Sequence, residues 1–422
     1  MKIRSMAATA VGALALAATG AAAVASADNG GQSKAPSFTA PANSLRSLAA
    51  DVNLRFGTAA TPLDLSDPTL SGITSSQFSV LTPENEMKWQ VVEPERGVYD
   101  WTGADNLVNY AEAHGELVRG HTLVWHNQLP NWLTSGVSEQ DSSGDCPAGS
   151  PSTCISNAEL KTLLHQHITT EVSRFRGKIW QWDVVNEMIS DNGTGLNLTS
   201  DFWLEHEGES IIPDAFRWAH AADPHALLCY NDYNIAGEDG NNAKFNTAYA
   251  LVKGMLADGV PISCVGDQGH LDLQYGFNGN LMTQDLQAYA NLGLKVAITE
   301  ADVRMFVDNA TQQDPIVGKF TNPDGTTGYD TNASHTADTA QAAWYDQMLT
   351  SCLQVRACIS FTVWGFDDQE SWVPSTFSGE GGADLYDVNL NQKPAYGALQ
   401  QTLEAALPGG IQRRPETGTP GL

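Results

Sequence analysis

Basic side chains are scarce in this chain of 422 residues, which carries 22 Lys and Arg against 49 Asp and Glu. The formal net charge is −27 with neutral histidines. A surface of this sign repels phosphate backbones, which argues against nucleic acid as a partner, and it also disfavours acidic polysaccharides. The charge therefore favours a neutral partner, although a need for solubility alone would explain it too.

Long apolar runs are absent after the first 27 residues, so we expect no membrane-spanning helix in the rest of the chain. The one apolar run, residues 6–24, follows Lys2 and Arg4 and ends in the small residues 25–27. This layout is typical of a secretory signal, and it predicts cleavage after Ala27 and an extracellular protein. The alternative is an uncleaved anchor, which the small Ala and Gly side chains and the lack of stop-transfer charges disfavour.

A long Pro-, Ser- or Thr-rich linker is also absent, so we expect no appended second domain. After the signal at 1–27 we predict a flexible segment at 28–42, one folded domain at 43–407 and a flexible tail at 408–422. We expect the domain to be a monomer.

Zinc-type CxxC pairs are missing, and in an exported chain the cysteines are candidates for disulfides. The six cysteines fall into three pairs in sequence order: Cys146/Cys154, Cys229/Cys264 and Cys352/Cys358. The first and third pairs close short loops, and we expect both to be disulfides. The middle pair lies in two separate predicted strands and either bridges or serves as small buried side chains.

Short β-branched or apolar runs alternate with helical patterns through the middle of the chain. We predict eight strands, at residues 54–57, 78–82, 117–121, 179–185, 226–230, 263–266, 294–299 and 359–364. Clear helical periodicity covers 159–175, 241–257 and 337–353, and Ser156 with Glu159 predicts a capping box at the first of these. Eight strand–helix repeats predict an α/β fold, the (β/α)8 TIM barrel, as a single domain.

Polar side chains stand at the end of almost every predicted strand. They are carboxylates, amides, imidazoles and indoles: Glu84, Asn85, His121, Asn186, Glu187, Asn231, Asp232, Gln268, His270, Glu300 and Trp364. Parallel strands place their C-terminal ends on one face of a barrel, so these groups should converge on one site.

Two of these groups, Glu187 and Glu300, end predicted strands four and seven, on opposite sides of the barrel mouth. Cleavage of a glycosidic bond needs one carboxylic acid to protonate the leaving oxygen and one carboxylate to attack the anomeric carbon. Two facing carboxylates disfavour joint ionisation, which keeps one of them protonated. The pair therefore indicates a retaining glycosidase, and the alternative for each glutamate is a structural ion pair.

Seven stretches resemble glycoside hydrolase family 10, the endo-β-1,4-xylanases, in order from about residue 45 to 407: TPENEMKW (82–89), VRGHTLVWH (118–126), WDVVNE (182–187), YNDYN (230–234), GDQGHL (266–271), ITEADV (298–303) and TVWGFDDQESW (362–372). The resemblance implies that Glu187 is the general acid/base and Glu300 the nucleophile. It implies that Asn186 binds the sugar's 2-hydroxyl, and that His270 and Asp302 hold the nucleophile.

The resemblance also implies a set of sugar-binding residues. Glu84, Asn85 and Lys88 match the subsite next beyond the cleaved sugar on its non-reducing side, and the sugar at the cleavage point is surrounded by His121, Trp125, Gln268, Trp364 and Trp372. Neutral sugars offer hydroxyls to amides and apolar C–H faces to indoles. Some of these residues have structural alternatives. Trp125, Trp364 and Trp372 would fill the core, His121 would be a core histidine with satisfied hydrogen bonds, and Lys88 would form a salt bridge with Glu84.

The chain departs from the family pattern in three places. Ala301 stands where the family commonly has a larger apolar residue, which predicts looser packing behind the nucleophile. Residues 136–156 extend the loop after strand three, and 308–335 extend the loop after strand seven. We expect both insertions to overhang the mouth of the barrel, where they would reshape the cleft.

Three other functions compete with a xylanase that acts on neutral xylan or xylo-oligosaccharides. A metal-dependent hydrolase is disfavoured because no HExxH occurs and the polar strand ends are not clustered as ligands. A non-catalytic carbohydrate-binding barrel would not need both glutamates. A relative that cuts another β-glycoside remains open. We expect no metal and no cofactor.

Overall fold

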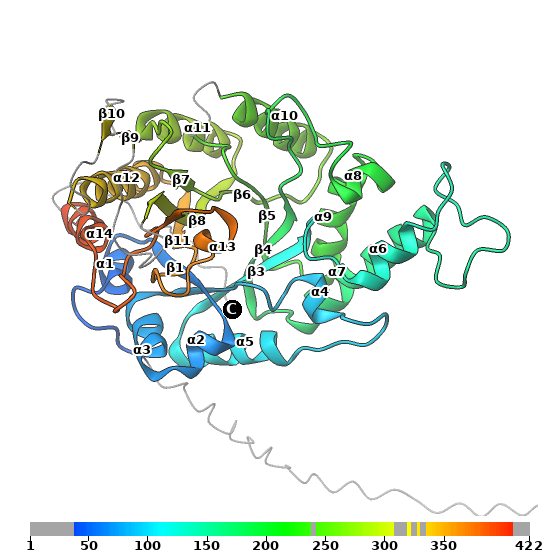
Figure 1. Cartoon of the computed structure of the whole chain (residues 1–422), viewed down its shortest axis with the longest axis horizontal. Helices are drawn as coiled ribbons and strands as arrows, with labels where there is room; N and C mark the ends of the chain where they lie inside the picture. Colours follow the sequence, from blue (N-terminus) through cyan, green and yellow to red (C-terminus); the bar gives the residue numbers. More distant parts are fainter. Residues whose placement is uncertain (1–37, 238–241, 308–318, 322–326, 330–334, 408–422) are drawn as a thin grey trace, which may run out of the picture. The chain divides into compact units, whose positions relative to one another are not determined.

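The computed structural model describes residues 38–237, 242–307, 319–321, 327–329 and 335–407 (Figure 1). The predicted signal segment and the predicted tail lie outside the described residues. None of the described helices combines the length and the apolar character that crossing a membrane requires.

Eight parallel strands form the centre of the fold and close on themselves, because β11 pairs with both β1 and β8. In barrel order they are β1 (Arg55–Ala60), β2 (Val80–Pro83), β3 (Leu117–Val124), β4 (Ile179–Asn186), β5 (Leu227–Asp232), β6 (Cys264–Asp267), β8 (Lys295–Phe306) and β11 (Cys358–Val363). Each overlaps one of the eight predicted runs. The predicted (β/α)8 barrel is therefore confirmed.

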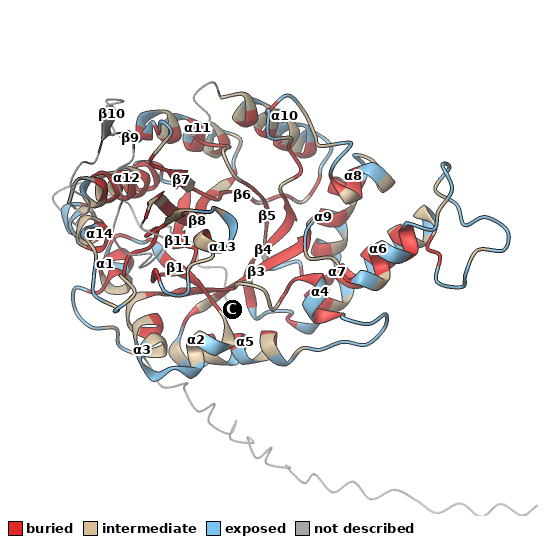
Figure 2. Ribbon diagram, in the orientation of Figure 1, coloured by how far each residue is buried: buried red, intermediate tan, exposed pale blue. Residues whose placement is uncertain are grey.

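Most of the fourteen described helices surround the barrel as a ring, and one short helix, α13 (Val373–Thr376), lies over the barrel mouth (Figure 1). They are α1 (Leu45–Asp51), α2 (Pro62–Ser66), α3 (Pro68–Gln77), α4 (Trp89–Val92), α5 (Thr102–His114), α6 (Asn131–Val137), α7 (Asn157–Arg174), α8 (Phe202–Glu207), α9 (Ile211–Ala222), α10 (Ala243–Ala257), α11 (Gly279–Asn291), α12 (His335–Gln354), α13 (Val373–Thr376) and α14 (Pro394–Ala405). The barrel strands are almost wholly buried, whereas the helices are buried on one face and exposed on the other (Figure 2). This pattern follows from amphipathic helices packing on a closed sheet.

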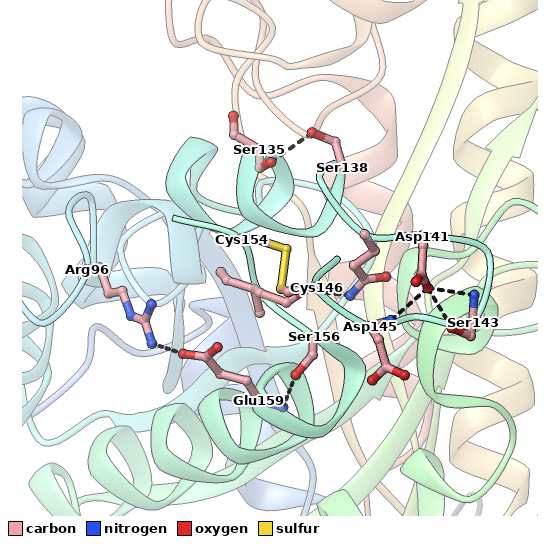
Figure 3. Close-up of a disulfide and its surroundings, with 12 residues drawn as sticks. Arg96, Ser135, Ser138, Asp141, Ser143, Asp145, Cys146, Cys154, Ser156 and Glu159 are labelled. Atoms are coloured by element: carbon pink, nitrogen blue, oxygen red, sulfur yellow. Dashed lines mark hydrogen bonds and ion pairs between the residues drawn. A yellow bond between two sulfur atoms is a disulfide. The ribbon is translucent and has the colours of Figure 1, made fainter. Parts of the chain in front are cut away.

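Helix α7 begins with half of the predicted capping box. The Ser156 hydroxyl accepts a hydrogen bond from the backbone N–H of Glu159 at 3.3 Å. The Glu159 carboxylate forms an ion pair with Arg96 on a different segment (Figure 3). A long-range partner has thus replaced the reciprocal bond that the local pattern predicts.

Beyond the barrel, β8 continues outward and pairs with two short strands that the sequence did not reveal, β7 (His270–Asp272) and β12 (Glu380–Gly381). Of the predicted insertion at 308–335, the structure describes mainly an antiparallel hairpin of β9 (Lys319–Thr321) and β10 (Thr327–Tyr329). Most of the insertion lies outside the described residues, and its predicted effect on the cleft stays a prediction.

All six cysteines are paired. Both short-loop disulfides, Cys146–Cys154 and Cys352–Cys358, are confirmed. The middle pair, Cys229–Cys264, is also a disulfide, and it joins residues that lie opposite each other on β5 and β6. The bridge alternative is therefore the correct one for this pair.

The insertion at 136–156 does not overhang the mouth of the barrel, so this prediction was wrong. Figure 1 shows α6 and the following loop extending outward from the ring of helices, and no residue of 136–156 lines the cleft described below. The backbone N–H of Ile155 donates to the Gly136 carbonyl at 2.9 Å, which holds the two ends of the loop together. The disulfide Cys146–Cys154 lies within this loop (Figure 3).

Candidate active site

A cleft of about 770 Å³ opens at the C-terminal ends of the barrel strands. Its walls include eleven of the thirteen predicted site residues: Glu84, Asn85, Lys88, His121, Trp125, Glu187, Gln268, His270, Glu300, Trp364 and Trp372. The other two, Asn186 and Asp302, are buried and hydrogen-bond to groups of the wall. The structure thus brings the predicted residues together in one place.

Glu187 directly follows the last residue of β4 and has an unusual backbone. Its φ is 60°, a left-handed conformation that residues other than glycine seldom adopt. Its backbone N–H donates to the carbonyl of Asn231 on β5 at 3.0 Å, which extends the strand pairing to this residue. Strain of this kind is typical of residues whose position matters for function.

The Glu187 carboxylate is bound by two neutral donors. The indole N–H of Trp125 donates to Oε2 at 2.7 Å, and the amide of Gln268 donates to Oε1 at 2.8 Å. Among the described residues, no cation lies within ion-pairing distance of this carboxylate. The side chain is thus fixed in direction while it stays partly open to the cleft.

Glu300, on β8, is 4 % exposed and lies among cationic groups. Its Oε1 is 3.3 Å from the Arg119 guanidinium, and its Oε2 is 3.4 Å from Nε2 of His270. Burial acts to raise the pKa of the Glu300 carboxyl, but the charge of His121, the His270 hydrogen bond and Arg119 together hold this pKa well below its usual range. The carboxylate is therefore ionised throughout the neutral pH range.

His270 is held between two carboxylates. Its Nδ1 lies 2.8 Å from Oδ2 of Asp302, and its Nε2 faces Glu300. Burial opposes the charged imidazole, but these two carboxylates outweigh it and raise the pKa of His270 to about 10. The indole N–H of Trp372 donates to the same oxygen of Asp302 at 2.9 Å, which ties the aromatic wall of the cleft to this pair.

Two buried residues of the site, Arg119 and Asp183, were missed by the sequence reasoning, whereas Asn231 was among the strand-end residues expected to converge. Arg119 forms ion pairs with Asp183 and with Glu300, and Asp183 also accepts from His121 Nδ1 at 2.9 Å. The Asn231 amide donates at 2.8 Å to Glu300. The available signal was that charged residues stand inside otherwise apolar strands, which is costly unless they are paired.

The buried amide of Asn186 has one side already occupied. Its Oδ1 accepts from Asn231 at 2.8 Å and from Gln268 at 3.3 Å. Its Nδ2 has no acceptor among the described residues. This N–H is therefore a buried donor without a partner, beside Gln268 of the cleft wall.

Lys88 does not form the salt bridge with Glu84 that was one alternative. Its ammonium donates to Oδ1 of Asn85 at 3.3 Å and stands 4.8 Å from the centre of the Trp125 ring. Burial lowers the pKa of Lys88, while Glu300, Glu84 and Glu187 act in the opposite direction. The Lys88 ammonium and the Asn85 amide thus face the cleft from the loop after β2.

Trp203, at the start of α8, holds Trp125 from behind. Its indole N–H donates to the backbone carbonyl of Trp125 at 3.0 Å, and its ring stacks on Trp89 with a centroid distance of 5.6 Å. Trp203 is fully buried. It therefore links the loops that follow β2, β3 and β4, which carry Lys88, Trp125 and Glu187.

One group of side chains has the composition of a metal site. Ligand atoms of His121, Asp183 and Glu300 lie within 4.8 Å of one another. Arg119 forms ion pairs with both carboxylates, so a fixed positive charge already occupies the place of a cation. The arrangement fits a compensated ion-pair network better than a set of free ligands.

The site can therefore perform two kinds of chemistry at once. Glu300 is a buried, ionised carboxylate, as an attacking group requires. Glu187 is a carboxyl group with neutral hydrogen-bond partners and an open side, as exchange of a proton with a ligand requires.

Comparison with known proteins agrees with this chemistry. The sequence model of Glycosyl hydrolase family 10 matches residues 44–402. Endo-1,4-beta-xylanase B of Thermotoga neapolitana is 37 % identical over 366 residues, which are 86 % of this chain and 92 % of that protein. Endo-1,4-beta-xylanase D of Talaromyces funiculosus is 37 % identical over 355 residues, 83 % of this chain and 75 % of that protein.

Solved structures give the same result. Xylanase 10B from Thermotoga petrophila RKU-1, crystallised in complex with xylobiose, is 36 % identical with a TM-score of 0.72, over 86 % of this chain and 98 % of that one. Native xylanase 10B from Thermotoga maritima has the same identity and TM-score, over 86 % and 99 % of the two chains. On the family match, the relatives and the barrel together, the chain belongs to glycosyl hydrolase family 10.

Proposed function

We propose that the protein is a retaining endo-β-1,4-xylanase, which hydrolyses internal β-1,4 bonds of xylan through a covalent glycosyl-enzyme intermediate. The observation that carries the proposal is the pair of unlike carboxylates, Glu187 and Glu300, in the wall of one cleft. The family assignment and the relatives named endo-1,4-beta-xylanase support the choice of substrate.

In the first step, a carboxylate oxygen of Glu300 attacks the anomeric carbon. The bond from that carbon to the glycosidic oxygen breaks, and its electron pair moves to the oxygen, which takes the proton of the Glu187 carboxylic acid. A glycosyl ester on Glu300 and a shortened chain with a free hydroxyl result. The unpaired N–H of Asn186 supports this step by donating to the oxygen of the 2-hydroxyl, which holds the sugar in place for the attack.

In the second step, the Glu187 carboxylate takes a proton from water while the water oxygen attacks the anomeric carbon. The ester bond breaks and its electron pair returns to Glu300 as a carboxylate. Two displacements on opposite faces restore the β configuration, which is why the mechanism is retaining. The charge of Glu300 is absent while the ester exists, so Glu187 acts as a base without a facing anion.

We also propose that the protein is exported. The basic, apolar and small-residue order of the first 27 residues supports this, as do the three disulfides, because such bonds persist in oxidising compartments.

The test is product analysis on a panel of xylans, glucans and small β-glycosides. We expect wild type to release reducing ends from xylan, NMR of the fresh product to show the β anomer, and Glu300→Gln to release none. An α anomer would overturn the nucleophile assignment. Preferential hydrolysis of a glucan would overturn the substrate, and absence of hydrolysis across the whole panel would indicate a carbohydrate-binding barrel.

A further inference from the structure

Tyr275 is unusual among the large side chains of the site, because it lines the cleft and is nevertheless 66 % exposed. Its ring makes no aromatic or cation–π contact within the part of the chain that the structure describes. A single exposed apolar side chain on a protein surface needs no explanation. An exposed ring in the wall of a ligand cleft does need an explanation, because the turn that carries it is held firmly.

The turn that carries Tyr275 is fixed at several points. The backbone N–H of Tyr275 donates to the Asp272 carbonyl at 3.0 Å, and the Asp272 carboxylate lies 3.1 Å from Arg304. Arg304 also donates to Glu380 at 2.7 Å, and Glu380 accepts from the Gln274 side chain at 3.0 Å. These bonds hold the backbone of the turn while the ring itself stays free.

Barrel order places Tyr275 opposite the residues assigned to the non-reducing side. Glu84 and Lys88 follow β2, whereas Tyr275 follows β6 and the short β7. In the closed order β1, β2, β3, β4, β5, β6, β8, β11, the strands β2 and β6 are four positions apart and face each other across the mouth. Figure 1 shows the same relation, since α5 and α11, which follow these two strands, lie on opposite sides of the ring.

We propose that Tyr275 is a stacking platform for a xylosyl residue on the leaving-group side of the cleft, and that it determines the preference of the enzyme for long chains. This rests on the proposed function, because a chain whose non-reducing part lies at Glu84 and Lys88 passes the two carboxylates and continues towards β6. A xylosyl ring presents apolar C–H faces, which pack on an aromatic face, and because the turn is held by its own bonds, only the Tyr275 side chain has to be ordered when it binds.

The test compares substrates that reach Tyr275 with one that does not. Kinetics are measured for wild type, Tyr275→Ala and Tyr275→Phe on xylohexaose and on an aryl β-xylobioside, whose leaving group is a single aromatic ring. For Tyr275→Ala we expect kcat/KM on xylohexaose to fall about tenfold, equivalent to about 1.4 kcal/mol. We expect kcat/KM on the aryl xylobioside to change less than about twofold, and Tyr275→Phe to resemble wild type on both.

Cleavage of end-labelled xylohexaose gives a second reading, because loss of the platform should move cleavage towards the reducing end. Tyr99→Ala is the matched control: Tyr99 is 36 % exposed, stacks on Trp101 and does not line the cleft. If Tyr275→Ala matches wild type on xylohexaose, or loses as much on the aryl xylobioside, the inference is wrong and the proposed function stands. If wild type cleaves no xylosyl substrate, both fail.

Discussion

The surroundings of Glu300 and Glu187 differ in charge and in burial. Glu300 is 4 % exposed, and Arg119 and His270 lie within 3.4 Å of its oxygens. Positive charge on this side of the cleft keeps the pKa of Glu300 low despite burial. Stabilising an anion in advance suits a group that must attack as an anion.

Glu187 has the opposite surroundings. Its two donors, the Trp125 indole and the Gln268 amide, are neutral, and its carboxylate is partly open to the cleft. Neutral donors fix the direction of a side chain without a full charge that opposes protonation. The comparison indicates that the surroundings of Glu300 keep it charged, whereas those of Glu187 allow it to exchange a proton.

The strongest way to sharpen this comparison is to vary the leaving group. We expect Glu187→Gln to lower kcat/KM on xylo-oligosaccharides by about 10²–10⁴-fold, because the leaving oxygen loses its acid. On a dinitrophenyl β-xylobioside, whose leaving group needs no proton, the loss should be below about tenfold. Glu300→Gln should be inactive on both substrates. An equal loss for Glu187→Gln on the two substrates would break the comparison.

Removal of the buried cation Arg119 tests the charged surroundings of Glu300. We expect Arg119→Met to lower the free energy of unfolding by about 3–5 kcal/mol, because Asp183 and Glu300 are left as under-compensated buried charges. The control Arg174→Met removes an exposed pair with Asp105 and should cost less than about 1 kcal/mol. Urea unfolding measures both, and equal costs would contradict the role given to Arg119.

The charge of His270 predicts two pH effects. In His270→Asn the pKa of Glu300 should rise, so that the acid limb of kcat/KM moves to higher pH. Because the folded pKa of about 10 exceeds the ordinary 6.5, the stability that His270 contributes is complete below pH 6.5 and is lost as the pH rises through 10. The difference in unfolding free energy between wild type and His270→Asn should therefore shrink over that interval. An unmoved acid limb would refute the first effect.

The smallest effect on kcat/KM is expected for a change behind Trp125, the residue that holds Glu187. Trp203→Phe removes the N–H that holds the Trp125 carbonyl and keeps an aromatic ring against Trp89. We expect kcat/KM on xylo-oligosaccharides to fall about tenfold or less, as the loss of one hydrogen bond allows, with little change on the dinitrophenyl substrate. Trp218→Phe, which alters a half-buried indole on α9 stacked on His165, is the control. Equal losses on both substrates would indicate a merely structural role.

Local patterns were enough to predict the barrel, and together with the family resemblance they predicted eleven of the residues that line the cleft. Strand runs and the polar residues that end them are short-range features, and parallel strands convert them into one site. Pairs that are distant in sequence left no such pattern: Arg119 and Glu300 are 181 positions apart. Arg119 was therefore missed, although an arginine inside an apolar strand was visible.

The insertion at 136–156 was predicted in place but not in direction. The length and polarity of 136–156 are consistent with any outward path, and the bond between Ile155 and Gly136 that helps to set the path pairs residues 19 positions apart. The short strands β7 and β12 were missed for a similar reason, since each is defined by its partner β8 and by no periodicity of its own.

The outward loop after α6 makes the protein easy to attach to other materials. Its tip at 147–149 is solvent-exposed, is enclosed by Cys146 and Cys154, and is not part of the cleft wall. Exposed loop tips of small residues are where inserted peptides are best tolerated. A peptide tag or a surface anchor spliced there would leave the mouth of the barrel facing free solution, so that an immobilised enzyme keeps access to an insoluble polymer.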